Sequence, residues 1–196
     1  MKACVALLLL VASCATVPPA VQAPALAAPA QYPLDFSTRQ SLSGDYDGRA
    51  LAVDCVVEKV GDRLTVIGLG PQGVRVFSVV QTGTAIDAQM YLGDQRWPFP
   101  PAFLLQDVHR LLLTGDPHMV QPDGLHRFRS HSMWVEELWS DGRVMRREFE
   151  DGVVVEFEGG ARAGAPPRHS RLTHGGRGYI LDVVALTFQT LENSGP

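Results

Sequence analysis

Apolar and polar residues alternate along much of the first half of the chain. From Arg49 to Val60, every second residue between Leu51 and Val57 is apolar, as on the buried face of a strand. Three more apolar segments follow, separated by short turns rich in glycine: Leu64 to Leu69, Val74 to Gln81 and Ala85 to Leu92. Tandem strands joined by short turns are typical of an antiparallel meander. The sequence therefore predicts four consecutive antiparallel strands.

The spacing of apolar residues then changes to that of a helix. Pro98-Phe99-Pro100-Pro101 ends the strand pattern, and proline is tolerated in the first turn of a helix. Apolar residues recur at helical spacing from Phe103 to Leu113, and Thr114-Gly115-Asp116-Pro117 ends the pattern. More than half of this helix surface is apolar, so we expect it to pack against the sheet.

A second group of strands is expected after the helix. Asp141-Gly142 and Asp151-Gly152 are dipeptides that favour tight hairpin turns. Ala161 to Pro167 and the mildly basic Arg168 to Arg177 are predicted to be loops. The predicted strands are Leu125 to His131, Met133 to Trp139, Arg143 to Glu150, Val153 to Glu158 and Tyr179 to Leu191, the last in preference to a helix. The fold class is therefore mainly β with one helix (α+β).

The N-terminus has the organisation of an export signal. A cationic start, Met1-Lys2, precedes the apolar run from Ala3 to Val11. Such a run is too short to cross ~30 Å of hydrocarbon as a helix. Residues 1–13 are therefore predicted to be a cleaved signal peptide.

The four residues that end this signal, Val11-Ala12-Ser13-Cys14, resemble the lipobox of bacterial lipoproteins. The resemblance implies cleavage before Cys14 and attachment of a diacylglycerol to its thiol, which makes membrane anchoring stable. The next residue is Ala15 rather than aspartate, which by the same resemblance implies sorting to the outer membrane. The alternative is an ordinary secretory signal that is cut later, near Ala23 or Ala28.

A proline-rich segment follows Cys14 and separates it from the rest of the chain. Five prolines lie between Ala15 and Pro33, and proline excludes a regular helix or a central strand. An extended chain of this composition could reach ~60 Å. We expect a lipidated tether without fixed structure at 14–33, one domain at 34–191, and a short tail at 192–196.

Composition narrows the classes of function. The chain carries 17 Lys plus Arg and 21 Asp plus Glu, a formal charge of −4, and this balance argues against nucleic-acid binding. Cys4 leaves with the signal and Cys14 is expected to be lipidated. Only Cys55 remains, so no intramolecular disulfide is expected, and its place in an alternating strand predicts a core position.

No constellation of residues indicates catalysis or a metal site. His126 and His131 are five residues apart, as are His169 and His174, and an odd separation on a strand places two side chains on opposite faces. The carboxylates near Glu136-Glu137 could in principle form a glycosidase pair, but we interpret them as residues of the solvated outer face. The other members of this group are Glu148, Glu150, Glu156 and Glu158, with Arg143, Arg146 and Arg147 as cross-strand partners.

Three segments carry a resemblance to a known family. They are 64–79 (LTVIGLGPQGVRVFSV), 100–108 (PPAFLLQDV) and 178–183 (GYILDV). Together with the lipobox and tether, they resemble an uncharacterised family of bacterial outer-membrane lipoproteins, a domain of unknown function often encoded beside aryl-polyene-type synthesis genes. That family is similar in architecture to LolA and LolB. The resemblance implies a curved antiparallel sheet, an unclosed barrel, covered by an apolar helix and able to hold acyl chains.

The resulting expectation is a non-enzymatic, monomeric, outer-membrane lipoprotein that binds or transfers a lipid or hydrophobic cargo. The resemblance implies acyl or aryl-polyene-type lipids as cargo and a periplasmic carrier or exporter as partner, with no cofactor. A tethered envelope scaffold and an envelope hydrolase are the alternatives. The cargo is expected in a cavity of several hundred Å³ under the helix. The candidate lining residues are Phe77, Met90, Trp97, Phe99, Phe103, Leu104, Val108, Leu112, Trp134 and Trp139.

Overall fold

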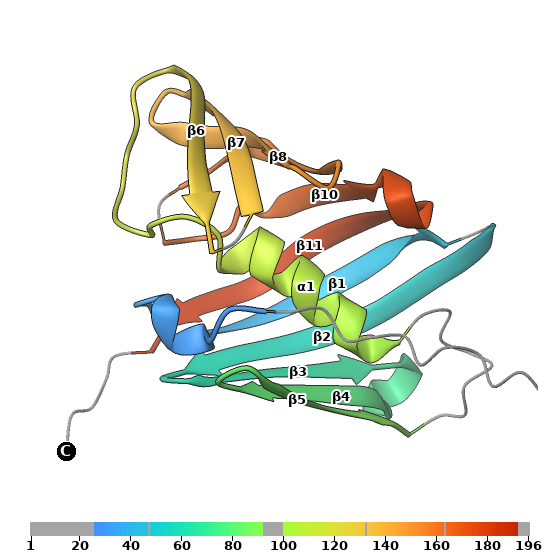
Figure 1. The fold of residues 1–196 in the computed structure, drawn as a ribbon. Coiled ribbons are helices and arrows are strands. Elements are labelled where there is room, and N and C mark those ends of the chain that lie inside the picture. The colour runs from blue at the N-terminus through green and yellow to red at the C-terminus, as the bar shows by residue number, and fades with distance from the viewer. Residues whose placement is uncertain (1–25, 47, 92–99, 132, 163, 192–196) are drawn as a thin grey trace, which may run out of the picture.

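Eleven antiparallel strands form one continuous sheet in this computed structural model, which describes residues 26–46, 48–91, 100–131, 133–162 and 164–191 (Figure 1). The strand order is β5-β4-β3-β2-β1-β11-β10-β9-β8-β7-β6, and the end strands β5 and β6 do not pair with each other. In chain order the strands are β1 Phe36–Tyr46, β2 Arg49–Val60, β3 Arg63–Leu69, β4 Arg75–Thr82, β5 Ala85–Met90, β6 Gly124–Ser130, β7 Met133–Ser140, β8 Arg143–Phe149, β9 Val153–Ala161, β10 His169–His174 and β11 Tyr179–Thr190. The expected fold class, an unclosed antiparallel barrel with a covering helix, is confirmed.

Nine of these strands coincide closely with segments predicted from the sequence. In β2, the inward residues between Leu51 and Val57 are buried while their neighbours are more exposed. The turn between β7 and β8 has positive φ at both Asp141 and Gly142, which is the conformation that an Asp-Gly hairpin turn requires. The alternation of apolar residues and the turn residues are therefore sufficient to predict these strands.

Two strands were not expected. β1 lies at the centre of the sheet between β2 and β11, although its buried face includes the polar residues Thr38 and Gln40. β10 forms within the segment from Arg168 to Arg177, so the prediction of a loop there is wrong. Its main chain pairs with β9 on one side and β11 on the other. Both segments contain few apolar residues in alternation. Backbone pairing with strands that are distant in sequence therefore determines that they form strands.

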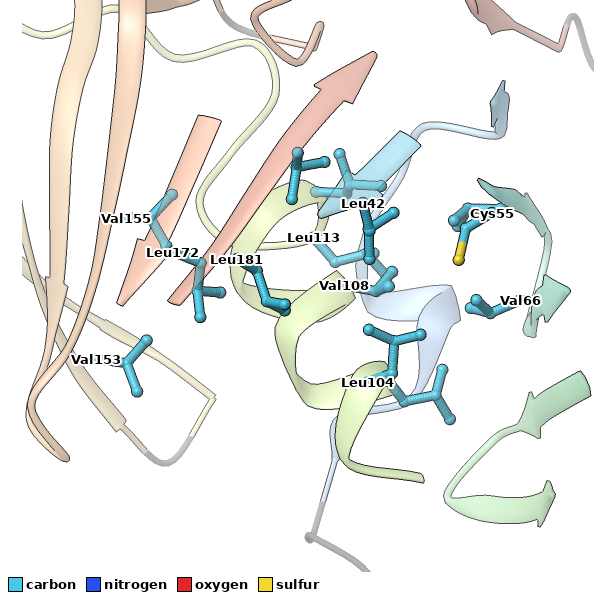
Figure 2. Packing of buried hydrophobic residues seen from close by; sticks show 14 of the residues in the cluster. Leu42, Cys55, Val66, Leu104, Val108, Leu113, Val153, Val155, Leu172 and Leu181 are labelled. Carbon is cyan, nitrogen blue, oxygen red and sulfur yellow. The ribbon is translucent and has the colours of Figure 1, made fainter. Parts of the chain in front are cut away.

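One α-helix, α1 (Pro101–Leu112), lies across the concave face of the sheet (Figure 1). Its side chains Leu104, Leu105 and Val108 are buried. Leu104 and Val108 lie close to side chains of β1, β2, β3 and β11. Figure 2 shows Leu104 and Val108 directed toward Leu42, Cys55 and Val66 of the sheet. Full burial of a large aliphatic side chain contributes about 1.5–3 kcal/mol. Cys55 is a core residue, as predicted, and is free. In the described part of the chain, no helix is long and apolar enough to cross a membrane.

Short 3₁₀ turns complete the secondary structure at η1 (Pro29–Gln31), η2 (Pro71–Gly73) and η4 (Gly175–Arg177). The first belongs to residues 26–33, which we call the N-terminal strap. These residues were expected to be the end of an unstructured tether, but they contact the domain. Pro29 and Tyr32 are buried, and the Gln81 amide donates to the carbonyl of Ala27 at 2.7 Å. Residues 1–25, including Cys14, lie outside the described residues.

Gly68 of β3 allows the aromatic ring of Phe77 on β4 to lie directly over the backbone. A Cβ atom at residue 68 would stand only 2.2 Å from the Phe77 ring, and the ring is fully buried. We expect Gly68→Ala to lower the free energy of unfolding by about 1–3 kcal/mol through overpacking. Urea unfolding measures this change. Gly175→Ala, where a Cβ meets nothing within 4 Å and φ is not positive, separates the overpacking from the effect of replacing a glycine.

Candidate ligand-binding pocket

A pocket of about 730 Å³ opens at the C-terminal end of α1. Its size falls in the range of small-molecule sites, about 300–1,000 Å³. Six parts of the chain form its walls: the strap and the start of β1, the end of α1, the following segment 113–121, strands β6 to β8, the segment 161–166, and Phe188 of β11. The pocket is therefore assembled from segments far apart in the sequence.

Aromatic and aliphatic side chains form much of this wall. Phe36 and Phe188 come from the paired strands β1 and β11, and their rings stack with centroids 5.6 Å apart. Tyr32 meets Phe36 edge-on at 6.3 Å. Phe128 and Trp139 contribute from the inner face of β6 and β7. This lining suits the apolar part of a ligand.

A buried charge network forms one polar part of the wall. Arg147 donates from Nε to Glu137 at 2.8 Å, and Trp139 donates from Nε1 to the other carboxylate oxygen at 3.0 Å. Arg147 also donates to the carbonyl of Arg110 in α1 at 2.8 Å. Glu137 and Arg147 are 4% and 6% exposed. The expected cross-strand pairing of the two charges is confirmed, but the prediction that Glu137 lies on the outer face is wrong.

Three histidines, His118, His126 and His131, also line the pocket. The ring of His126 is hydrogen-bonded to the carbonyl of Pro122, and the ring of His131 to the side chain of Gln31 at 2.9 Å. Desolvation lowers the pKa of His131 below its usual value. Among the residues that the structure describes, no three His, Cys, Asp or Glu side chains are grouped so as to hold a metal ion.

Two of the predicted cargo residues, Leu112 and Trp139, line the pocket. Leu104, Val108 and Phe77 are instead buried between α1 and the sheet. A cavity under the helix has a volume of only about 10 Å³, and side chains of β1, β2, β3 and β11 line it. The expected cavity under α1 is thus a packed core, and the pocket lies beside it.

The other predicted cargo residues lie away from this pocket. Met90 and Phe103 are half-buried against the core, and the Arg177 guanidinium lies 3.9 Å from the centre of the Phe103 ring. Trp134 is 43% exposed on the outer face of β7, with Arg127 over its ring. Trp97, Phe99 and Cys14 lie outside the described residues. Sequence reasoning missed Phe36, Tyr32, Phe128 and Phe188, although the alternation in 125–131 places Phe128 opposite Leu125.

Polar contacts from Asp107, His109 and Arg110 connect the second half of α1 to the sheet. Asp107 accepts a hydrogen bond from the Tyr179 hydroxyl at 2.5 Å and pairs with Arg110 one turn later. Arg110 also pairs with Asp151 in the turn after β8, and the His109 ring is hydrogen-bonded to Gln81 at 2.7 Å. Burial raises the pKa of Asp107 to about 6, against the opposing effect of the Tyr179 hydrogen bond and Arg110. These ties make α1 a fixed element of the fold.

Two buried histidines give the stability of the fold a dependence on pH. Desolvation lowers the pKa of His109 to about 4, and desolvation together with Arg177 and Arg110 lowers that of His174 to about 4. Between pH 6.5 and 4 the unfolded chain therefore binds protons that the folded chain excludes, so stability falls as pH falls. The raised pKa of Asp107 acts in the opposite direction between about pH 6 and 4, but it offsets only one of the two histidines.

We expect the free energy of unfolding to drop by about 3 kcal/mol from pH 7 to pH 4. Urea titrations across this range measure the drop. His109→Gln keeps a hydrogen-bond donor for Gln81 but has no titrating ring. The free energy of unfolding of this variant should therefore depend less steeply on pH. An unchanged pH dependence in this variant would contradict the assignment to His109.

The family model described as "Protein of unknown function (DUF3261)" matches residues 37–187. The chain belongs to this family. No curated protein matches it. Among solved structures, it is similar to a LolA superfamily protein from Nitrosomonas europaea, with 13% identity, 82% of this chain and 88% of that chain covered, and a TM-score of 0.48. It is also similar to a protein from Vibrio parahaemolyticus described as an outer membrane lipoprotein-sorting domain, with 10% identity, 82% and 87% coverage, and a TM-score of 0.44.

Proposed function

We propose that this member of the DUF3261 family binds a lipid or other hydrophobic cargo in the pocket at the end of α1. The pocket itself is the observation that supports this function most strongly. It combines a volume of about 730 Å³, in the range of small-molecule sites, with a wall of aromatic and aliphatic side chains and a polar wall that includes three histidines and the buried pair Glu137 and Arg147. The proposed role is binding and transfer without catalysis, by a monomer.

The proposed place of action is the periplasmic face of the outer membrane. The lipobox-like residues before Cys14 support a lipid anchor there, and the proline-rich segment supports a domain held away from the bilayer. The proposed cargo is an acyl or aryl-polyene-type lipid, received from a periplasmic carrier or an exporter. These finer assignments rest on the sequence resemblance.

Native mass spectrometry tests the binding function. The chain from Ala15 onward, which keeps the strap, would be purified from the periplasm without detergent. We expect a fraction with added mass that dissociates into a lipid or polyene. A mass of the protein alone, with no uptake of added fatty acids, would reject the proposal.

The second candidate function is a tethered envelope scaffold. The packed interface between α1 and the sheet favours it, since no ligand can enter there without unpacking the core. A scaffold requires no ligand in the neighbouring pocket. The same mass-spectrometry experiment therefore separates the two functions.

A further inference from the structure

The strap is a wall of the pocket as well as the beginning of the domain. Gln31, Tyr32 and Pro33 all line the pocket. Tyr32 is only 9% exposed and packs against Phe36, which lines the same space. Displacement of the strap would therefore widen the pocket directly.

The strap is held by side-chain contacts and the burial of Pro29 and Tyr32, without the backbone pairing that holds a strand. Its own backbone hydrogen bonds are local, from Gln31 to Ala28 and from Tyr32 to Pro29. The described strap residues belong to no strand of the sheet. Side chains make its polar contacts with the domain: Gln81 to the Ala27 carbonyl at 2.7 Å, Asp62 to the Ala30 N–H at 3.3 Å, Lys59 to the Tyr32 carbonyl at 2.6 Å, and Gln31 to His131 at 2.9 Å.

Two of the other walls, the β6–β8 side and α1, are held more firmly. β6, β7 and β8 belong to the continuous sheet. α1 is tied down by Asp107, His109 and Arg110, which are all buried. The segment 113–121 is joined to fixed elements at both ends, and its Leu113 and Pro117 are buried. The strap leads into β1 through Leu34 and Asp35, and its described residues belong to no strand. Weakly held segments open at lower free energy than packed elements.

The contact between Gln31 and His131 connects the strap to the turn between β6 and β7 across the pocket. The two residues are 100 positions apart in sequence, and their hydrogen bond is exposed. Both residues line the pocket. This hydrogen bond links the strap to the β6–β8 side of the pocket, and we call it the latch.

We propose that the strap is the moving wall of the pocket: ligand enters and leaves when the strap is displaced and the latch opens, while α1 stays in place. This inference rests on the proposed binding function. The strap directly follows the proline-rich segment that leads to Cys14. A pull on the predicted anchor would therefore act first on this wall of the pocket.

Hydrogen–deuterium exchange of the chain from Ala15 onward tests the motion without any ligand. We expect the amides of Gln31 and Tyr32 to exchange at least tenfold faster than those in the middle of α1, such as Val108. Equal or faster exchange in α1 would overturn the proposal. This result is independent of whether a ligand binds.

Dissociation kinetics of dansyl-undecanoic acid, followed by stopped-flow fluorescence, test the link to binding. Gln31→Ala removes the latch, and loss of one hydrogen bond should raise the dissociation rate about fivefold. The matched control is Gln106→Ala, which removes the contact between α1 and Arg177 at 2.8 Å and should leave the rate unchanged. A faster rate in Gln106→Ala with no change in Gln31→Ala would make α1 the moving wall. If the probe does not bind the unmodified chain, the proposed function fails, and the exchange experiment still decides whether the strap moves.

Discussion

Arg147→Met should lower the free energy of unfolding by about 3–5 kcal/mol. The substitution keeps much of the side-chain volume but leaves the Glu137 carboxylate, which is 4% exposed, without its cationic partner. The carbonyl of Arg110 in α1 also loses its donor from Arg147. A buried charge without compensation is among the most destabilising changes that a fold can receive. Urea unfolding measures the loss.

Two further variants show whether burial of the charge causes this effect. Arg146→Met removes the neighbouring arginine on the opposite face, whose pair with Glu148 has both side chains 43% exposed, and it should cost less than about 1 kcal/mol. Adding Glu137→Gln to Arg147→Met removes the stranded charge and keeps an acceptor for Trp139. We expect this double variant to recover most of the lost stability. Equal losses for Arg147→Met and Arg146→Met would contradict the explanation.

The sequence predicts those parts of the fold that local patterns determine. The alternation from Leu51 to Val57 and the Asp141-Gly142 turn each fix their element without distant contacts. β1 has no such pattern, because Thr38 and Gln40 occupy inward positions between apolar ones. Thr38 is accommodated by donating to the carbonyl of Thr187 on β11 at 2.6 Å. A partner 149 residues away cannot be inferred from the composition of the strand.

The inward position of Glu137 is indicated by the alternation of residues in its strand. Val135, Glu137 and Trp139 share one face of a strand by simple alternation, and two of the three are typical core residues. The general rarity of buried glutamate favoured an outer position. The compensating charge is Arg147, which lies opposite Glu137 in the register of β7 and β8. A regular hairpin at Asp141-Gly142 would place Arg146 opposite Glu137, but a register shift between Leu138 and Trp139 places Arg147 there instead. The inward position of Glu137 could therefore have been inferred from the alternation, but its partner could not.

The position of the pocket could not be inferred in the same way. Sequence periodicity identified α1 as apolar on more than half its surface, which fits either a lid over a cavity or a packed core. The structure shows a packed core under Leu104 and Val108, with about 10 Å³ of free space. The pocket depends instead on segments without periodicity, the strap, 113–121 and 161–166, whose mutual arrangement arises only in the folded chain.

Ser130→Trp should reduce the affinity for dansyl-undecanoic acid at least a hundredfold, about 2.7 kcal/mol. Ser130 is the last residue of β6 and lines the pocket. An indole at this position would occupy space that the proposed ligand requires, since the open pocket can receive it without displacement of the core. We therefore expect the free energy of unfolding to change by less than about 1 kcal/mol. Fluorescence titration of the probe measures the affinity.

The matched control is Leu125→Trp, five residues earlier on the same strand. Leu125 is 64% exposed and points to the outer face, away from the pocket. The same large side chain there should leave probe affinity unchanged. Loss of binding in Ser130→Trp alone would place the ligand in the pocket at the end of α1. Retention of binding in both variants would place the ligand elsewhere. Since side chains fill the space under α1, the exposed apolar residues of the outer face would then be the next candidates for the ligand-binding site.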